Sequence, residues 1–157
     1  MTTLDPASII AKAAPGQHCS PGRGCGIHDT RPGHCRAFNC AWMTESWLGA
    51  EWKPERSKFV LTIDPVTHFL LVQLDPGAPN AWKAEPFYSQ LKRWSAAALE
   101  KNHHVIVFLN RSATVVLPDT DVVLGVIETG ERIVTRQRNT PYGPRVDVMK
   151  VAAGAMA

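Results

Sequence analysis

The residues of this sequence with the clearest chemical potential are its four cysteines. Cys19, Cys25, Cys35 and Cys40 lie within 22 residues of one another, and the 117 residues after Cys40 contain no further cysteine. Their spacing is Cys-x5-Cys-x9-Cys-x4-Cys. Thiolate is a soft ligand that favours zinc, Cu(I) or an iron–sulfur cluster, and a closed zinc site takes four such ligands. This confinement to one short segment predicts a single metal or cluster site.

Disulfides and unrelated free thiols are the competing interpretations. A disulfide scaffold distributes its cysteines along the chain, whereas here they stop at residue 40. Residues 1–6 show no basic region followed by an apolar stretch, so we expect no secretory signal and a cytoplasmic location. Because disulfides are disfavoured in that compartment, the sequence favours metal ligation by all four cysteines.

The spacing leaves the identity of the metal open. It lacks the paired Cys-x2-Cys knuckles of zinc ribbons and the close spacing of ferredoxins. Four thiolates give a net negative charge around Zn²⁺ and around an oxidised four-iron cluster alike, so the arginines between the cysteines would offset either. A zinc ion is our first expectation, and iron or a [4Fe-4S] cluster is the alternative.

Histidines and arginines accompany the cysteines along the chain. Imidazole suits zinc and iron, so a histidine could replace one thiolate, although four thiolates already complete a tetrahedron. A guanidinium can donate hydrogen bonds to loop carbonyls or to sulfur. We therefore expect supporting positions beside the metal for His18, His28, Arg31, His34 and Arg36.

Residues 25–38 read Cys-Gly-Ile-His-Asp-Thr-Arg-Pro-Gly-His-Cys-Arg-Ala-Phe. This stretch resembles the Cys-x-Ile-Tyr-x-x-Arg-Pro-x-x-Cys-Arg-x-Phe element of the YkgJ-type cysteine-cluster family, described as zinc- or iron-chelating. His28 stands where tyrosine is commoner, and only Cys19 precedes Cys25, whereas many members carry a denser upstream cluster. The resemblance covers residues 17–48 and implies a metal-binding protein without implying a particular reaction.

The elements that position the cysteines are a loop and two helices. A short helix is expected over Pro6–Ala13 with Asp5 as its N-cap, because proline is favoured at the first helical position. Closely spaced Gly and Pro predict a loop from Gln17 to Gly33. The run Cys35–Leu48 is expected to be helical and to end at Gly49.

The remainder of the chain has mixed α and β patterns. The best helix pattern spans Pro86–Lys101, with apolar residues on a 3–4 residue rhythm. Strand-like runs come in pairs around turn residues: Lys58–Asp64 with His68–Leu74, His104–Leu109 with Thr114–Leu117, Val122–Ile127 with Arg132–Arg136, and a last strand at Val146–Val151.

These elements predict an α+β fold. We expect an N-terminal Cys-rich metal-binding loop and helix, followed by a small antiparallel sheet packed with one long helix. The expected divisions are a metal-binding segment at 1–49, an α+β domain at 50–151 that forms one compact unit with it, and a flexible tail at 152–157.

Composition and charge exclude several function classes. The chain has 157 residues, 45% hydrophobic and 20% charged, which is typical of one globular domain. Its net charge of +3 is too small to indicate nucleic-acid binding, and the even spacing of Arg132, Arg136 and Arg138 predicts a solvated strand face. No apolar run is long enough to span a membrane. A protein partner or a small molecule remains the expected ligand.

Signatures of catalysis are absent from the sequence. It contains no nucleophile elbow, phosphate-binding glycine loop, dinucleotide fingerprint or His-Glu-x-x-His helix. Asp119 and Asp121 are expected in a turn beside Pro118. His103 and His104 are not expected to chelate one ion, because adjacent residues of a strand point to opposite faces. The five tryptophans are expected to be core and lid residues.

Overall fold

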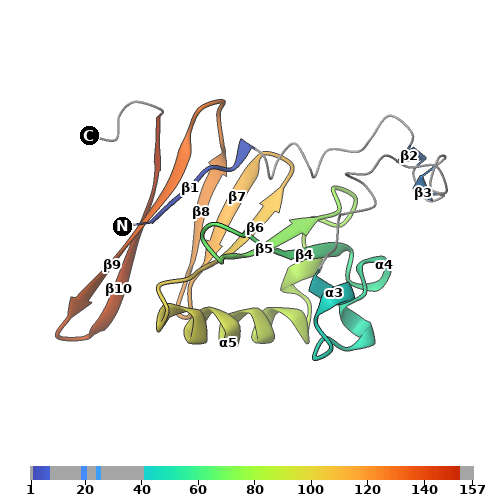
Figure 1. Cartoon of the computed structure of the whole chain (residues 1–157), viewed down its shortest axis with the longest axis horizontal. Helices are drawn as coiled ribbons and strands as arrows, with labels where there is room; N and C mark the ends of the chain where they lie inside the picture. Colours follow the sequence, from blue (N-terminus) through green and yellow to red (C-terminus); the bar gives the residue numbers. More distant parts are fainter. Residues whose placement is uncertain (1, 8–18, 21–23, 26–40, 153–157) are drawn as a thin grey trace.

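The computed structural model describes residues 2–7, 19–20, 24–25 and 41–152 (Figure 1). The fold is α+β, as the sequence predicts. In this part of the chain the strands form a five-stranded sheet, a three-stranded sheet and a two-stranded ladder. One long helix, α5, lies along the five-stranded sheet (Figure 1).

The five-stranded sheet has the order β4-β5-β6-β7-β8. Its strands are β4 (Phe59–Ile63), β5 (Leu70–Leu74), β6 (Val105–Leu109), β7 (Ser112–Val116) and β8 (Asp121–Val126). The predicted hairpins β4–β5 and β6–β7 are confirmed as antiparallel pairs. Strands β5 and β6 are parallel, and α5 (Phe87–Leu99) crosses over between them, as a parallel connection requires.

Short helices precede these elements and connect them. They are α3 (Ala41–Thr44), η2 (Ala50–Trp52), α4 (Pro54–Ser57) and η3 (Ala81–Lys83). The expected long helix Pro86–Lys101 is confirmed as α5, which buries Leu91 and Ser95 against the sheet. Pro54 occupies the first turn of α4, where its missing N–H costs no hydrogen bond.

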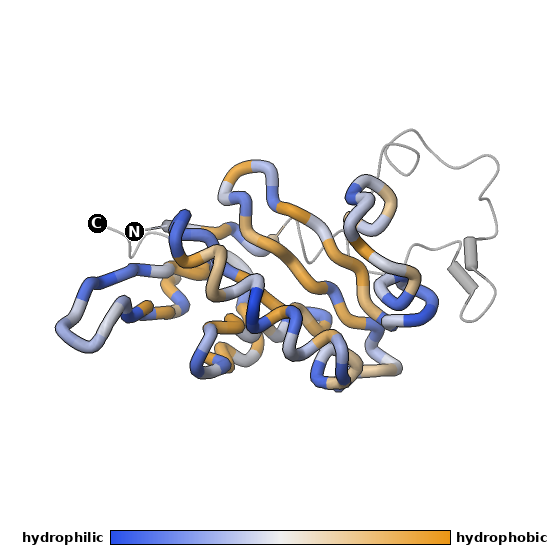
Figure 2. The backbone as a smooth tube through the Cα atoms, turned by 90° about the horizontal axis from the view of Figure 1, so that it is seen from below, coloured by the Kyte–Doolittle hydropathy of each residue, from blue (hydrophilic) through white to orange (hydrophobic). Residues whose placement is uncertain are grey.

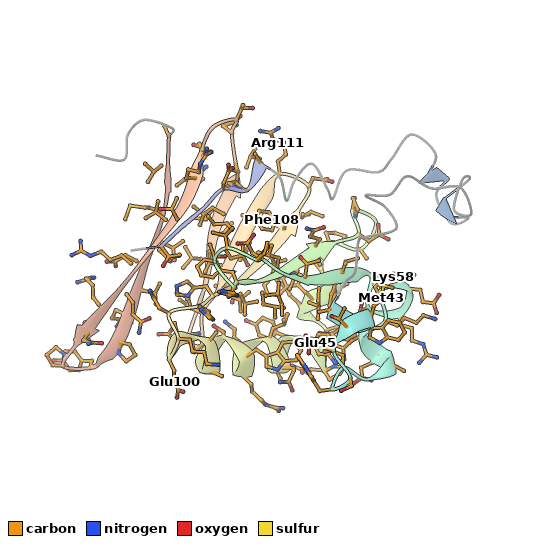
Figure 3. The ribbon with its side chains drawn as sticks, in the orientation of Figure 1. Met43, Glu45, Lys58, Glu100, Phe108 and Arg111 are labelled. Carbon is orange, nitrogen blue, oxygen red and sulfur yellow. The ribbon has the colours of Figure 1, made fainter. Side chains whose placement is uncertain are left out.

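The five-stranded sheet is buried on both faces. In β6, Val105 and Val107 belong to the core on one face, whereas Ile106 and Phe108 belong to the core on the other. Phe108 is labelled in Figure 3. The first core contains Leu91 of α5, and the second is closed by the three-stranded sheet. Burial on both faces explains why β6 is an unbroken apolar run rather than an alternating one.

The three-stranded sheet has the order β1-β9-β10 and is antiparallel throughout. Its strands are β1 (Thr2–Leu4), β9 (Arg132–Thr140) and β10 (Gly143–Val151). The β9–β10 hairpin extends beyond the core, and its tip is hydrophilic, whereas the strands of the five-stranded sheet are largely hydrophobic (Figure 2).

Two expectations about the sheets are wrong. The single antiparallel sheet is instead a mixed sheet and a separate antiparallel one, since β5–β6 is parallel. The expected pairing of Val122–Ile127 with Arg132–Arg136 does not form, because β8 pairs with β7 while β9 pairs with β1 and β10. The turn around Gly130 carries the chain from one sheet to the other rather than closing a hairpin.

The expected N-terminal helices lie largely outside the described residues. The backbone N–H of Ala7 donates to Asp5 Oδ1 at 3.0 Å, as the predicted N-cap requires, and residues 8–13 are not described. The run Cys35–Leu48 is described only from residue 41. There the helix ends at Thr44 rather than at Leu48.

Candidate metal centre

Two of the four cysteines lie in the described part of the chain, and their backbones are paired. Strand β2 (Cys19–Ser20) and strand β3 (Gly24–Cys25) form an antiparallel ladder in which Cys19 is opposite Cys25. Residues directly opposite in such a ladder have Cα atoms about 4.5–5.5 Å apart. The register therefore brings two predicted ligands to neighbouring backbone positions.

The other predicted site residues fall outside the described residues. They are Cys35, Cys40, His18, His28, Arg31, His34 and Arg36. Within the described ranges, no group of three or more His, Cys, Asp and Glu residues is arranged to hold a metal ion. Ligation by the four cysteines therefore stays a prediction.

The paired cysteines fit a thiolate centre by chemistry and by backbone separation. Four thiolates close a zinc site without help from other donors. The same register suits a disulfide, because disulfide-bonded residues have Cα atoms about 4.4–6.8 Å apart. Experiments below separate these two states of Cys19 and Cys25.

The chain that follows Cys40 enters the core at once. Ala41 is 5% exposed and begins α3, and Leu48 is 8% exposed. Trp42 Nε1 donates to the carbonyl oxygen of Gly49 at 3.1 Å, which holds the turn between these two buried residues. The position next to the last cysteine is therefore held by tertiary contacts.

An aromatic cluster of Trp47, Trp52, Phe87 and Trp94 joins the chain after Cys40 to α5. The ring of Trp52 lies 4.8 Å from that of Phe87 and 4.9 Å from that of Trp94, measured between centroids. Trp47 meets Trp94 edge-on at 5.1 Å, although Trp47 itself is 57% exposed. Trp52 and Trp82 are buried, which agrees with the expected core role of the tryptophans.

The chain that precedes the cysteines is anchored on the other side of the five-stranded sheet. Leu4 is 2% exposed, pairs with Ile133 of β9 and belongs to the second core. Asp5 Oδ1 lies 3.3 Å from Arg132 Nη1. Ala41 belongs to the first core. The chain between Leu4 and Ala41, called the cysteine segment below, thus connects two anchor points on opposite faces of one sheet.

His103 and His104 have different surroundings, as expected for adjacent residues of an extended chain. His104 is 1% exposed, and its ring lies 5.1 Å from that of Phe69. Burial, with a smaller effect of His103, lowers the pKa of His104 to about 4. His103 instead lies beside His68, with 5.6 Å between their ring centroids.

Sequence reasoning missed this second histidine pair. The parallel register sets Leu70 opposite Val105, and His68 and His103 each stand two residues before this pair. The only signal in the sequence is that each histidine stands two residues before a strand. The pairing itself follows from the parallel arrangement of β5 and β6, which local patterns do not reveal.

Strands β9 and β10 carry four arginines, Arg132, Arg136, Arg138 and Arg145. Three of them form ion pairs with acidic side chains. Arg138 makes a two-pronged contact with Asp147, at 2.6 and 3.0 Å. Arg145 lies 3.6 Å from Asp119. The hydrogen bond from Arg138 lowers the pKa of Asp147, so this carboxylate remains charged. This pairing of charges does not form the continuous basic stripe that nucleic acid favours.

Asp119 and Asp121 do not act as a carboxylate pair. Asp119 faces Arg145, whereas Asp121 accepts hydrogen bonds from Tyr88 at 2.8 Å and from Lys92 at 2.6 Å. Asp121 is the first residue of β8, and Asp119 lies in the preceding bend. The two carboxylates therefore have separate structural partners.

A groove in the described part of the chain lies between α5 and the β9–β10 hairpin. Its volume is about 450 Å³, and its lining includes Leu99, Glu100, Pro118, Gln137 and Pro144. Glu100 extends from the end of α5 (Figure 3). The Gln137 Oε1 atom is buried without a hydrogen-bond partner among the described residues.

Comparisons with known proteins identify no relative of this chain. The chain matches no family model, and no curated protein or solved structure shows a significant match to it. None of the helices between residues 41 and 152 has the length and apolar character needed to cross a bilayer. The family resemblance of residues 25–38 stays a prediction.

Proposed function

We propose that this chain is a cytoplasmic metal-binding protein similar to the YkgJ-type family, with one zinc ion held by Cys19, Cys25, Cys35 and Cys40. The observation that carries the proposal is the backbone pairing of Cys19 with Cys25. It supports a common site because ligands of one ion must approach within a few ångströms of one another. The remaining two ligands come from the segment that ends at the buried Ala41.

The proposed role of the zinc is structural. A loop rich in Gly and Pro has little regular hydrogen bonding, and four metal–thiolate bonds supply the missing tertiary contacts. The anchors on either side, Leu4 and Ala41, hold the ends of the segment on opposite faces of the sheet. The metal then determines how the chain between these ends is arranged.

The protein as a whole acts as a binding or adaptor module. This part of the proposal is supported by apolar side chains on the surface where the chain leaves the cysteine segment. Met43, labelled in Figure 3, is 62% exposed, and Trp47, four residues further along the chain, is 57% exposed. Grouped exposed apolar side chains are a feature of interaction surfaces. The partner is a protein or a small molecule with an apolar part.

Metal and acid-labile sulfide analysis tests the proposed centre. The full chain is purified without oxygen, chelators or a histidine tag, and its visible spectrum is recorded. One zinc per chain without sulfide, and a colourless sample, is the expected result. Iron with matching sulfide would replace zinc by a cluster with a redox or sensing role. Metal-free protein with no free thiol would identify two disulfides and overturn the proposal.

Single substitutions test the ligand set. Cys35→Ser is expected to lose the metal, and Ser20→Ala is a matched control in the same segment that should keep it. X-ray absorption at the zinc edge should give four sulfur neighbours at about 2.3 Å. A spectrum with three sulfurs and one nitrogen would mean that a histidine such as His34 replaces a cysteine.

A further inference from the structure

His68 and His103 form a second histidine pair, which lies just before the parallel strands β5 and β6. Backbone hydrogen bonds hold both residues. The rings of His68 and His103 are 5.6 Å apart between centroids and are tilted by 36°. Each stands two residues before the first pair of the β5–β6 register, Leu70 with Val105. No hydrogen bond involves either ring within the described part of the chain.

Each histidine is positioned by its backbone and by a buried neighbour. The N–H of His68 donates to the carbonyl oxygen of Asp64 at 2.8 Å, and that of His103 donates to the carbonyl oxygen of Ala98 at 2.9 Å. The next residues along the chain, Phe69 and His104, are buried and in ring contact at 5.1 Å. The buried pair thus fixes the backbone positions of His68 and His103, while the exposed ring of His68 can turn.

This spacing suits two imidazoles bound to one metal ion. A ligated ion lies about 3.2 Å from each ring centroid, since the Zn–N bond is about 2.1 Å and the nitrogen is about 1.1 Å from the centroid. Two such rings have centroids about 5.2 Å apart at a tetrahedral angle and about 5.5 Å apart at 120°. The observed 5.6 Å is within 0.1 Å of the wider geometry.

We propose that His68 and His103 together bind one divalent late transition-metal ion, such as Zn²⁺, Ni²⁺ or Cu²⁺, with water completing its coordination. Imidazole nitrogen suits these ions and not Mg²⁺ or Ca²⁺. The described residues offer no third protein ligand. The ion therefore keeps positions open to water or to a donor atom of another molecule. This site is separate from the cysteines and does not depend on the function proposed for them.

Further observations on this pair favour metal binding. Burial, followed by the neighbouring His68 and Lys101, lowers the pKa of His103 below its ordinary value. His68 is exposed, so its ring can turn toward an entering ion. The positive charge of Lys101 opposes binding, which limits the expected affinity.

Zinc titration followed by NMR tests the site residue by residue. Zn²⁺ is added to the full chain after its cysteines are saturated with metal, and the imidazole C–H resonances are recorded. We expect those of His68 and His103 to shift together and to saturate at one further ion, while those of His104 stay in place. The assignment of shifts to individual histidines makes the result independent of what the cysteines bind.

Asparagine substitutions provide the matched variants. His68 has a φ of 61°, a left-handed conformation that asparagine tolerates better than alanine, so His68→Asn is expected to fold. His68→Asn and His103→Asn should each weaken Zn²⁺ or Ni²⁺ binding, measured by calorimetry, by more than about tenfold. Glu128→Asn, at an exposed position in another turn, should leave this affinity unchanged.

Two outcomes would overturn the proposal. One is a titration to millimolar Zn²⁺ in which the resonances of His68 and His103 do not move together. The other is a variant series in which the second ion survives the double substitution at positions 68 and 103, or is lost in Glu128→Asn. Thermal melts of all variants check that each is folded before its affinity is compared.

Discussion

At the residue scale, we expect buried polar groups without hydrogen-bond partners to have large effects on the free energy of unfolding. Among the described residues, four such atoms belong to His104, Thr135 and Gln137. A buried polar group that makes no hydrogen bond costs about 1–3 kcal/mol relative to its hydrated state. The first two lie deep in the fold, each 1% exposed, and both can be replaced by apolar residues of similar shape.

His104 is expected to make stability depend on pH. Burial holds its pKa at about 4 in the folded chain, below the ordinary value of 6.5 that it regains on unfolding. The unfolded chain therefore binds more protons between these two pH values. The free energy of unfolding contributed by this residue is fully present above pH 6.5, and it falls by up to about 3 kcal/mol as the pH decreases toward 4.

Urea unfolding at pH 7 and at pH 4.5 measures this effect. His104→Phe keeps an aromatic ring against Phe69 but cannot be protonated. The variant should lose distinctly less stability than the wild type between the two pH values, and the difference isolates His104 from other titrating groups. Equal losses in the two proteins would contradict the assignment.

Thr135→Val is expected to raise the free energy of unfolding by about 1 kcal/mol. The substitution removes the buried hydroxyl, which has no partner in the described part of the chain, and leaves a side chain of nearly the same shape. Thr62→Val, at a partly exposed position of β4, is the control and should change stability by less than about 0.5 kcal/mol. Denaturant unfolding measures the free energy of unfolding of both variants. A lower value for Thr135→Val than for the wild type would show that the Thr135 hydroxyl has a hydrogen-bond partner in solution.

At the element scale, four polar contacts attach α5 to the far strands of the five-stranded sheet, one of them the hydrogen bond from Tyr88 to Asp121. Ser95 Oγ donates to the carbonyl oxygen of Val116 at 2.6 Å. Lys92 Nζ donates to the carbonyl oxygen of Leu117 at 2.7 Å and to Asp121 at 2.6 Å. The side chains of Lys92 and Asp121 are 18% and 22% exposed, so solvent screens this ion pair only in part.

Lys92→Met is expected to destabilise the protein by about 1–2 kcal/mol. The substitution keeps the aliphatic contacts of the side chain but leaves Asp121 with only the Tyr88 hydroxyl as a donor. Arg93→Met, on the exposed side of the same helix, is the matched control and should have little effect. If the two variants lose similar amounts of unfolding free energy, the removal of one positive charge, rather than the contact of Lys92 with Asp121, accounts for the change.

At the scale of the whole molecule, the two ends of the cysteine segment belong to different cores. Leu4, in β1 of the three-stranded sheet, belongs to the core that this sheet closes, and Ala41 belongs to the core on the helix side of the five-stranded sheet. The first residues of the chain are therefore part of the tertiary structure and not a loose extension.

Leu4→Ala should lower the free energy of unfolding by about 2–4 kcal/mol, as large-to-small substitutions do at buried leucines. The neighbouring Thr3→Ala, at a partly exposed position of the same strand, should cost far less. Thermal or denaturant unfolding compares the two. A loss below about 1 kcal/mol in Leu4→Ala would show that β1 contributes little to the fold.

Metal removal is expected to affect the cysteine segment and to leave the α+β core folded. The core residues between positions 41 and 151 are held by apolar contacts that need no metal, whereas the proposed zinc holds the segment. A chelator should accelerate trypsin cleavage after Arg23 and Arg36 by more than about tenfold, as followed by mass spectrometry. Far-UV circular dichroism should change little. Loss of cooperative unfolding on chelation would instead make the metal a requirement for the whole fold.

Local sequence patterns predicted most elements of this protein but not their partners. The helix α5 and the hairpins β4–β5 and β6–β7 follow from apolar periodicity and turn residues, which act over a few positions. The parallel pairing of β5 with β6 does not, because it joins residues separated by a whole helix. The same is true of β1, whose partner β9 lies more than a hundred residues further along the chain.

The sequence by itself determined which donor atoms the cysteine segment offers, and metal binding by them stays a prediction. Four thiols in one short segment are a set of soft donors, because donor type and local spacing are properties of neighbouring residues. Only the tertiary structure decided that His68 meets His103, that His104 is buried, and that Arg138 and Arg145 have acidic partners. The physical reason is that charge pairing, burial and metal geometry depend on distances in space, and these are set when the two sheets close around their cores.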